Sequence, residues 1–172
     1  AISRSQQGRP VRPIPRDYIR STEHAPGSDA VIEEMIEKLE DYSAEVDVVS
    51  NESEAADAIS TFLADQKATS VVVPTGLDAA FKEAAARDDR TVREDSREHA
   101  TPTLELDEIA AVVTRSRVAI SISRTIILDG QPDQRRRPIS LVPATHPLVL
   151  KASDLPPPLP PALPTPVQNP TR

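Results

Sequence analysis

The clearest place for ligand chemistry in this sequence is a turn at Thr75 and Gly76. These two residues follow a compact apolar run, Val71 to Val73, and precede a segment with helical spacing. At such strand-to-helix turns an open α/β sheet presents backbone N–H groups to phosphate or carboxylate ligands. No GxGxxG or GxxxxGK[ST] motif occurs, so an ordinary turn is favoured over an anion site. We keep Thr75 and Gly76 as candidate ligand-binding residues.

A second candidate is the basic run Arg135-Arg136-Arg137, which lies between two β-type runs. Guanidinium groups bind carboxylates and phosphates with two parallel hydrogen bonds. A solvated loop tip is the favoured interpretation of such a run, but Arg136 and Arg137 remain candidate anion ligands.

The three histidines, His24, His99 and His146, are far apart in the sequence, and none has metal-ligand spacing. A zinc enzyme is therefore not expected, and no metal site is predicted. His146 lies between two apolar runs, where a structural histidine is favoured over a catalytic base, although it stays a candidate site residue. No Ser-His-Asp or GxSxG pattern occurs, so the catalytic residues, if the chain is an enzyme, are unknown.

Hydrophobic periodicity and turn residues predict the elements that position these side chains. The predicted helices are 28–42, a second one started by a capping box at Asn51 and Glu54, 78–87, and a short one at 104–112. The predicted strands are 46–49, 70–74, an edge strand at 91–94, 118–122, 125–128, 139–142 and 147–150. Strands and helices alternate in the first half and strands dominate the second. The pattern favours an α/β fold, an open mixed sheet with flanking helices and an antiparallel extension.

Composition divides the chain into three parts. Residues 1–27 carry scattered prolines and suit an extended N-terminal arm, residues 28–155 form the expected α/β domain, and the proline-rich residues 156–172 suit a disordered or polyproline II tail. At 172 residues the chain is long enough to bury one core.

Charge and cysteine content exclude several classes of function. A net charge of −7 argues against binding to nucleic acid or to anionic membranes, which require a basic excess. The chain has no Cys, so it cannot form a disulfide or a cysteine-ligated iron–sulfur cluster. No apolar run approaches the roughly 20 residues that span a bilayer, and residues 1–20 lack the apolar centre of a signal peptide. A cytoplasmic location is therefore expected.

One stretch resembles the signature region of the LUD-domain (lactate-utilization, DUF162) family, in particular its lactate utilization protein C-like branch. The residues that carry the resemblance are Val112-Val113-Thr114, Val118-Ala119-Ile120, Thr125-Ile126-Ile127-Leu128-Asp129, Gln134, Arg136-Arg137, Ser140-Leu141-Val142-Pro143 and His146. Pro15-Arg16-Asp17-Tyr18 and Leu39-Glu40-Asp41-Tyr42 extend it upstream, so that it covers residues 10–155. The resemblance implies a NagB/RpiA/CoA-transferase-like fold and a role in oxidising L-lactate to pyruvate. It also implies iron–sulfur clusters in partner proteins, with no cofactor in this chain.

The sequence departs from the family pattern mainly at glycine positions. Arginines stand at Arg115, Arg124 and Arg135 where the family has glycine, Ile122 replaces an acidic residue, and the usual C-terminal motif is absent. Arginine at a glycine position should force a different turn or block a ligand.

Two hypotheses remain, and whether the chain is an enzyme stays open. In one, the chain is an accessory subunit that binds a small anion at Thr75, Gly76, Thr125, Arg136, Arg137 and His146. In the other, it is a noncatalytic or degenerate LUD-domain binding or regulatory protein that has lost its ligand site.

Overall fold

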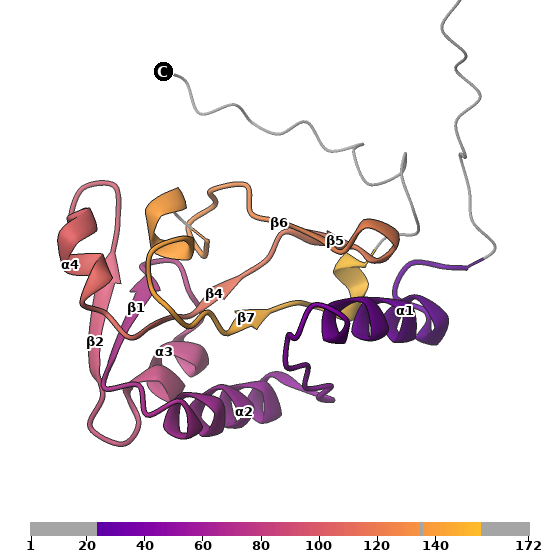
Figure 1. The fold of residues 1–172 in the computed structure, drawn as a ribbon, viewed down its shortest axis with the longest axis horizontal. Helices are drawn as coiled ribbons and strands as arrows, with labels where there is room; N and C mark the ends of the chain where they lie inside the picture. The colour runs from indigo at the N-terminus through magenta and orange to yellow at the C-terminus, as the bar shows by residue number, and fades with distance from the viewer. Residues whose placement is uncertain (1–23, 135, 156–172) are drawn as a thin grey trace, which may run out of the picture.

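The core of the fold is a parallel sheet built around one fully buried strand. The computed structural model describes residues 24–134 and 136–155 (Figure 1). In it β1 (Ser70–Pro74) lies between β2 (Thr91–Asp95) and β3 (Ala111–Val112), parallel to both. The three valines of β1 are buried completely, as expected for a strand that is covered on both faces. The predicted α/β fold is confirmed, while its likeness to the NagB/RpiA/CoA-transferase group stays a prediction.

The sheet continues past β3 through a second pair of strands. Val113 joins β3 to β4 (Thr114–Arg115), and β4 pairs in parallel with β7 (Leu148–Val149). The backbone N–H groups of 112, 114 and 116 donate to the carbonyls of 145, 147 and 149. All these strands run in one direction, so their carboxyl ends meet at one edge of the sheet. In open α/β sheets that edge is where ligands bind.

The predicted antiparallel strands follow β4 and form a separate two-stranded hairpin. It consists of β5 (Val118–Ile120) and β6 (Thr125–Ile127), joined by the 3₁₀ turn η1 (Ser121–Ser123). Arg124 closes the turn in the left-handed conformation, with φ 54°.

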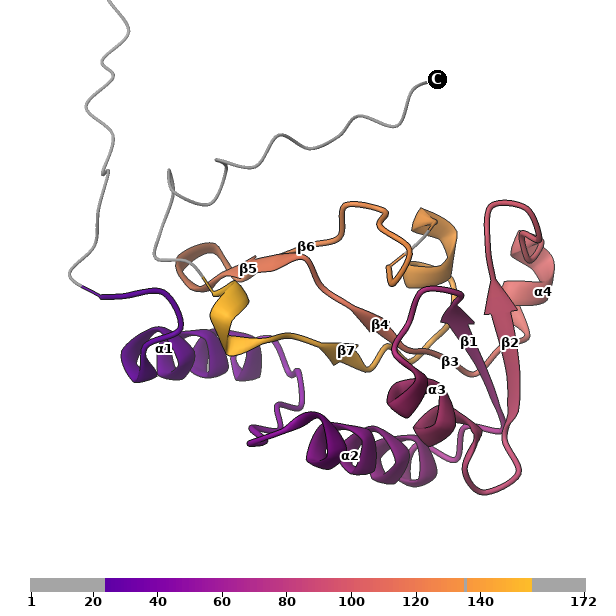
Figure 2. The same ribbon diagram turned by 180° about the vertical axis from the view of Figure 1, so that it is seen from behind.

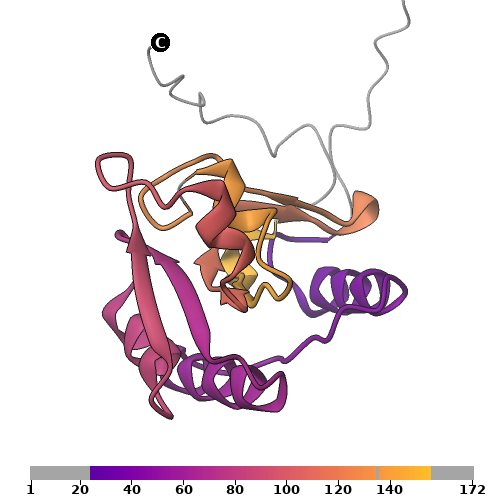
Figure 3. The same cartoon turned by 60° about the vertical axis from the view of Figure 1, so that its left-hand side comes forward.

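Helices cover both faces of the parallel strands (Figures 1 and 3). Val71 and Val73 face α2 (Glu52–Asp65) and α3 (Ala79–Ala86), whereas Val72 faces α4 (Thr103–Asp107) and the 3₁₀ turn η2 (Arg137–Ser140). Residues alternate between the two faces of a strand, so the compact valine run serves both layers.

The remaining helix, α1 (Asp29–Glu40), packs beside the hairpin rather than on the parallel strands (Figure 2). Its buried residues Val31 and Met35 contact Ala119 and Leu155, and Leu155 follows the last 3₁₀ turn, η3 (Ala152–Asp154). Within residues 24–134 and 136–155, no helix is both long and apolar enough to cross a lipid bilayer.

Two predicted strands are wrong. Residues 46–49 alternate in polarity but pair with no other strand, and Val48 is 69% exposed. Residues 139–142 are predicted to be β, yet 137–140 form η2, with Pro138 in its first turn, and Leu141 is 69% exposed.

The short helix expected at 104–112 ends at Asp107, and β3 follows it. The predicted cap at Asn51 is confirmed, because its side chain accepts the Glu54 N–H at 2.9 Å, while Glu54 accepts the N–H of Ser50, one residue before the N-cap, at 2.8 Å. Most of the predicted arm, residues 1–23, and the whole predicted tail, residues 156–172, lie outside the described residues.

Candidate functional site

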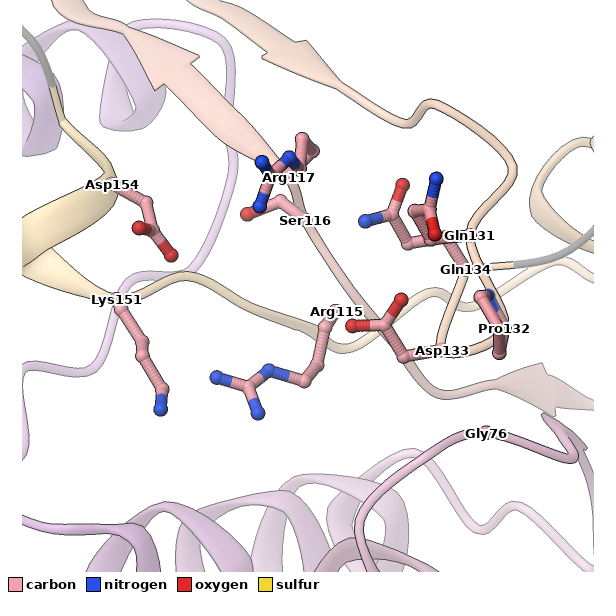
Figure 4. Close-up of a pocket in the computed structure, with 10 residues that line it drawn as sticks. All are labelled: Gly76, Arg115, Ser116, Arg117, Gln131, Pro132, Asp133, Gln134, Lys151 and Asp154. Carbon is pink, nitrogen blue, oxygen red and sulfur yellow. The ribbon is translucent and has the colours of Figure 1, made fainter. Parts of the chain in front are cut away.

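A polar hollow of about 490 Å³ opens at the carboxyl edge of the parallel strands (Figure 4). Its walls come from the turn after β1, the chain between β4 and β5, the loop before η2 and the segment after β7. The residues that line it are Gly76, Arg115, Ser116, Arg117, Gln131, Pro132, Asp133, Gln134, Lys151 and Asp154. Three of them are cations and two are carboxylates.

Strand register explains why the cations gather here. Arg115 pairs with Val149, and the alternation of side chains along the strand places Arg115 on the same side as Val113. Val113 and Val149 pack in the core under α2 and α3. Arg115 therefore continues this face beyond the cover of the helices, and Arg117 follows it at the bend before β5.

Each cation has a carboxylate partner near the hollow. Arg115 is ion-paired with Asp78, the residue at the N-cap position of α3. Lys151 lies 3.0 Å from Glu52, the first residue of α2, and Arg117 lies 3.7 Å from Asp129. Lys151 and Glu52 are both well exposed to water, and an exposed pair of this kind contributes only about 0–1 kcal/mol, so an incoming anion can compete for Lys151. Arg115 is only 15% exposed, so its pair with Asp78 is partly shielded from water.

The loop at 129–134 is held over the hollow by its own hydrogen bonds. The buried Gln134 side chain accepts the Asp129 N–H at 2.7 Å, and the Gly76 N–H donates to the Pro132 carbonyl at 2.9 Å. A Cβ at position 76 would overlap the backbone of Pro132. Gly76 is thus required by a close approach of two loops, and its N–H is occupied by the protein itself.

The structure places Arg136 in a buried ion pair. Its Nε and Nη2 atoms donate to the two carboxylate oxygens of Asp95 at 3.0 and 2.7 Å, and Nη2 also donates to the Thr101 carbonyl. Asp95 is fully buried at the end of β2, and its backbone carbonyl accepts the Thr75 N–H. Burial raises the pKa of the Asp95 carboxyl, but hydrogen bonds from Arg136 and Thr101 outweigh it and hold that pKa below its usual value. The pair joins β2, the loop before η2 and the turn after β1.

His146 is also engaged within the protein. Its Nε2 lies 2.8 Å from the hydroxyl of the buried Thr114, and burial lowers its pKa to about 4. The imidazole is therefore neutral at pH 7.

The remaining candidates lie apart from the hollow. Thr125 is exposed beside the hairpin turn, and Arg137 is exposed at the start of η2. Of the six residues predicted to bind a ligand, all within the described part of the chain, only Gly76 lines the hollow.

Sequence reasoning missed Arg117 and Lys151 as residues of the hollow. Arg115 lies in β4 and lines the hollow, with no turn at this position, and whether it blocks a ligand stays a prediction. The available signal was the Arg-Ser-Arg alternation directly after a buried strand. Lys151 carried no such signal.

Across residues 24–134 and 136–155, no three His, Asp or Glu side chains are grouped to hold a metal ion.

Comparison with known proteins gives consistent results. A family model described as the LUD domain matches residues 32–165. The chain is 32% identical over 146 residues to lactate utilization protein C of Deinococcus radiodurans, a match that covers 85% of this chain and 61% of that protein. The chain thus spans about three fifths of the length of this curated relative.

A solved structure is similar as well. The crystal structure of a DUF162 family protein from Deinococcus radiodurans matches with a TM-score of 0.68 and 32% identity, covering 77% of this chain and 76% of that one.

Proposed function

Because the chain belongs to the LUD-domain family, we propose that it acts in lactate utilization, as an accessory subunit in the oxidation of L-lactate to pyruvate. The observation that carries the proposal is its 32% identity to lactate utilization protein C over 85% of the chain. As part of the same proposal, the protein works in the cytoplasm, away from membranes and nucleic acid.

The proposal places the iron–sulfur clusters in partner proteins. Oxidation of L-lactate to pyruvate removes two electrons and two protons, so an electron acceptor is needed. Protein iron–sulfur clusters are held mainly by cysteine thiolates, and this chain has no Cys. The chain would contribute a ligand site and a docking surface, and the partners would supply the clusters.

The hollow at the sheet edge is compatible with a small carboxylate ligand. Arg115, Arg117 and Lys151 supply positive charge, and arginine can bind a carboxylate with two hydrogen bonds. Asp133 and Asp154 supply acceptors for a hydroxyl group. These features support anion binding without identifying a catalytic residue.

The test is a complementation experiment in a bacterium that lacks its own C component. Expression of this chain should restore growth on L-lactate, and the tagged chain should co-purify with cysteine-rich partner subunits that carry lactate-dependent electron transfer. Arg87→Gln removes an ion pair remote from the hollow and serves as the control. Lactate oxidation that is unchanged by the presence of the chain, with no partner captured, would refute the proposal.

A noncatalytic binding or regulatory protein is the alternative. It is favoured by the ion pairs that already occupy Arg115, Arg117 and Lys151. Under this alternative, purified chain binds an anion or a partner, while lactate-dependent electron transfer proceeds equally well without it.

A further inference from the structure

The described part of the chain packs as two units with separate cores. The hairpin unit consists of α1, the β5–β6 hairpin and η3, which share one apolar cluster that contains Met35, Ala119 and Leu155. The sheet unit consists of the parallel strands and the helices on their two faces, and it contains the other buried clusters. The hairpin forms a two-stranded sheet of its own, and the two units lie at opposite ends of the view in Figure 2.

Two strand connections lie side by side where the units meet. One leads from β4 into β5, and the other leads from β7 into η3. The Ser116 N–H in the first connection donates to the Val149 carbonyl, where the second begins, at 3.0 Å. The other connections, residues 43–51 and 128–134, contain no helix or strand. Adjacent crossings of this kind can act as a hinge, because a few residues at the ends of elements absorb the rotation.

The polar hollow lies beside this hinge, where packed side chains would otherwise join the units. Gly76 and Arg115 line it from the sheet unit, and Lys151 and Asp154 line it from the hairpin unit (Figure 4). Packed cores resist deformation because their side chains interdigitate, whereas a hollow of about 490 Å³ contains no such packing. The units can therefore move apart here without breaking an apolar core.

An exposed ion pair joins the two units next to the hollow. Lys151, at the N-cap position of η3, lies 3.0 Å from Glu52, the first residue of α2. The two side chains are 46% and 59% exposed. Exposed ion pairs contribute little to stability and are screened by salt. A contact this weak leaves the state without it substantially populated.

We propose that the hairpin unit rotates relative to the sheet unit about the Ser116–Val149 crossing, and that the Lys151–Glu52 ion pair latches the closed state. The structure shows the closed state, with the ion pair formed. When the pair breaks, the hollow widens and the residues that line it from the two units move apart. The rotation controls access to the hollow whatever binds there, so the inference does not depend on the proposed role in lactate oxidation.

The test measures the distance between the two units in the full chain. Because the chain has no Cys, spin labels attach only to cysteines introduced for the purpose. Glu37→Cys on α1 and Asp65→Cys on α2 place one label on each unit at exposed positions. Double electron–electron resonance at low salt should show two distances, one for the closed state and one for the open state.

Variants of the ion pair test the latch. Glu52→Gln should raise the ratio of open to closed molecules about two- to fivefold, and added salt should act in the same direction. Glu52→Lys combined with Lys151→Glu should restore the original ratio, because the reversed pair can form. Arg87→Gln is the matched control, since it breaks a similarly exposed pair with Asp57 that lies within the sheet unit, and it should leave the ratio unchanged.

Three results would overturn the inference. The first is a single distance that neither Glu52→Gln nor salt alters. The second is an equal change of the ratio in Arg87→Gln and Glu52→Gln, which would show a general effect of surface charge. The third is a ratio that charge reversal fails to restore, because the Lys151–Glu52 pair would then not be the latch.

Discussion

Replacing Arg136 tests whether this arginine supports the fold or is reserved for a ligand. The Asp95 carboxylate is 0% exposed and accepts two hydrogen bonds from Arg136 and one from the Thr101 N–H at 2.7 Å. Arg136→Gln removes the charge that compensates this buried carboxylate. We therefore expect a large loss of folding stability, although Arg136 lies in a loop.

The magnitude follows from the geometry of the pair. Removing one partner of a buried ion pair costs about 3–5 kcal/mol, because the other charge is left without compensation. The Arg136 side chain is 26% exposed and the Thr101 hydrogen bond survives, which favours the lower end. A loss of about 3 kcal/mol lowers Tm by on the order of 6–12 °C in a domain of this size.

Urea unfolding of Arg136→Gln, Asp95→Asn and the double variant measures the effect and isolates the pair. The double variant should be more stable than the sum of the two single losses predicts, since it leaves no buried charge unpaired. A loss below about 1 kcal/mol at pH 7, or strict additivity in the cycle, would show that the pair does not hold these elements together.

The pH dependence gives an independent check. In the unmodified protein the pKa of Asp95 is lowered, so its stabilising effect is complete above the unfolded-state pKa near 4 and is lost as pH falls through the folded value. In Arg136→Gln, burial acts without the guanidinium and raises the pKa of Asp95. The stability difference between the two proteins should therefore shrink as the pH falls toward 4.

Three further substitutions have defined outcomes. Gly76→Ala places a Cβ against the backbone of Pro132 and should lower the free energy of unfolding by about 1–3 kcal/mol; an unchanged urea midpoint would show that the loop moves freely. Arg124→Gly should be about 1 kcal/mol more stable than Arg124→Ala, because the φ of 54° at this position strains any residue with a Cβ. Both variants lose the cation–π contact with Tyr42 at 4.4 Å, so equal stabilities would show that the backbone at 124 is not strained. Between pH 6.5 and 4 the unmodified protein should lose up to about 3 kcal/mol of stability through His146, because the histidine takes up a proton in the unfolded state and, with its pKa near 4, not in the folded state. His146→Gln should abolish this loss, and identical dependence of stability on pH in the two proteins would refute the prediction.

The parts of the fold that the sequence predicts well are those decided by local interactions. The capping box joins Asn51 to a residue three positions away, so its spacing is visible in the chain. β1 is predictable because a short valine run between turn residues can satisfy two apolar layers at once.

The wrong strands show where local patterns stop being informative. Residues 46–49 alternate in polarity, but alternation does not supply a neighbouring strand to bond with. In 139–142 only Ile139 is fully buried, and Pro138 lies in a 3₁₀ turn, so a single buried side chain does not indicate a strand face. In both cases, whether the segment forms a strand depends on a neighbouring strand elsewhere in the chain, which the sequence of the segment does not show.

The same limit explains the candidate site. Lys151 reaches the hollow only because β7 pairs with β4, which is more than thirty residues earlier in the chain. Arg136 looks like a free anion ligand in the sequence, since nothing local shows that Asp95 will lie opposite its guanidinium. Long-range pairing decides which charges meet a ligand and which meet each other.

The two described arginines at family glycine positions have different physical meanings. At Arg124 the backbone itself requires a left-handed conformation, so arginine costs about 1 kcal/mol there, which the Tyr42 ring partly offsets. At Arg115 the backbone is an ordinary strand, and the substitution instead adds a cation to the wall of the hollow. Changes at 124 should therefore alter folding stability, whereas changes at 115 should alter the charge on the wall of the hollow.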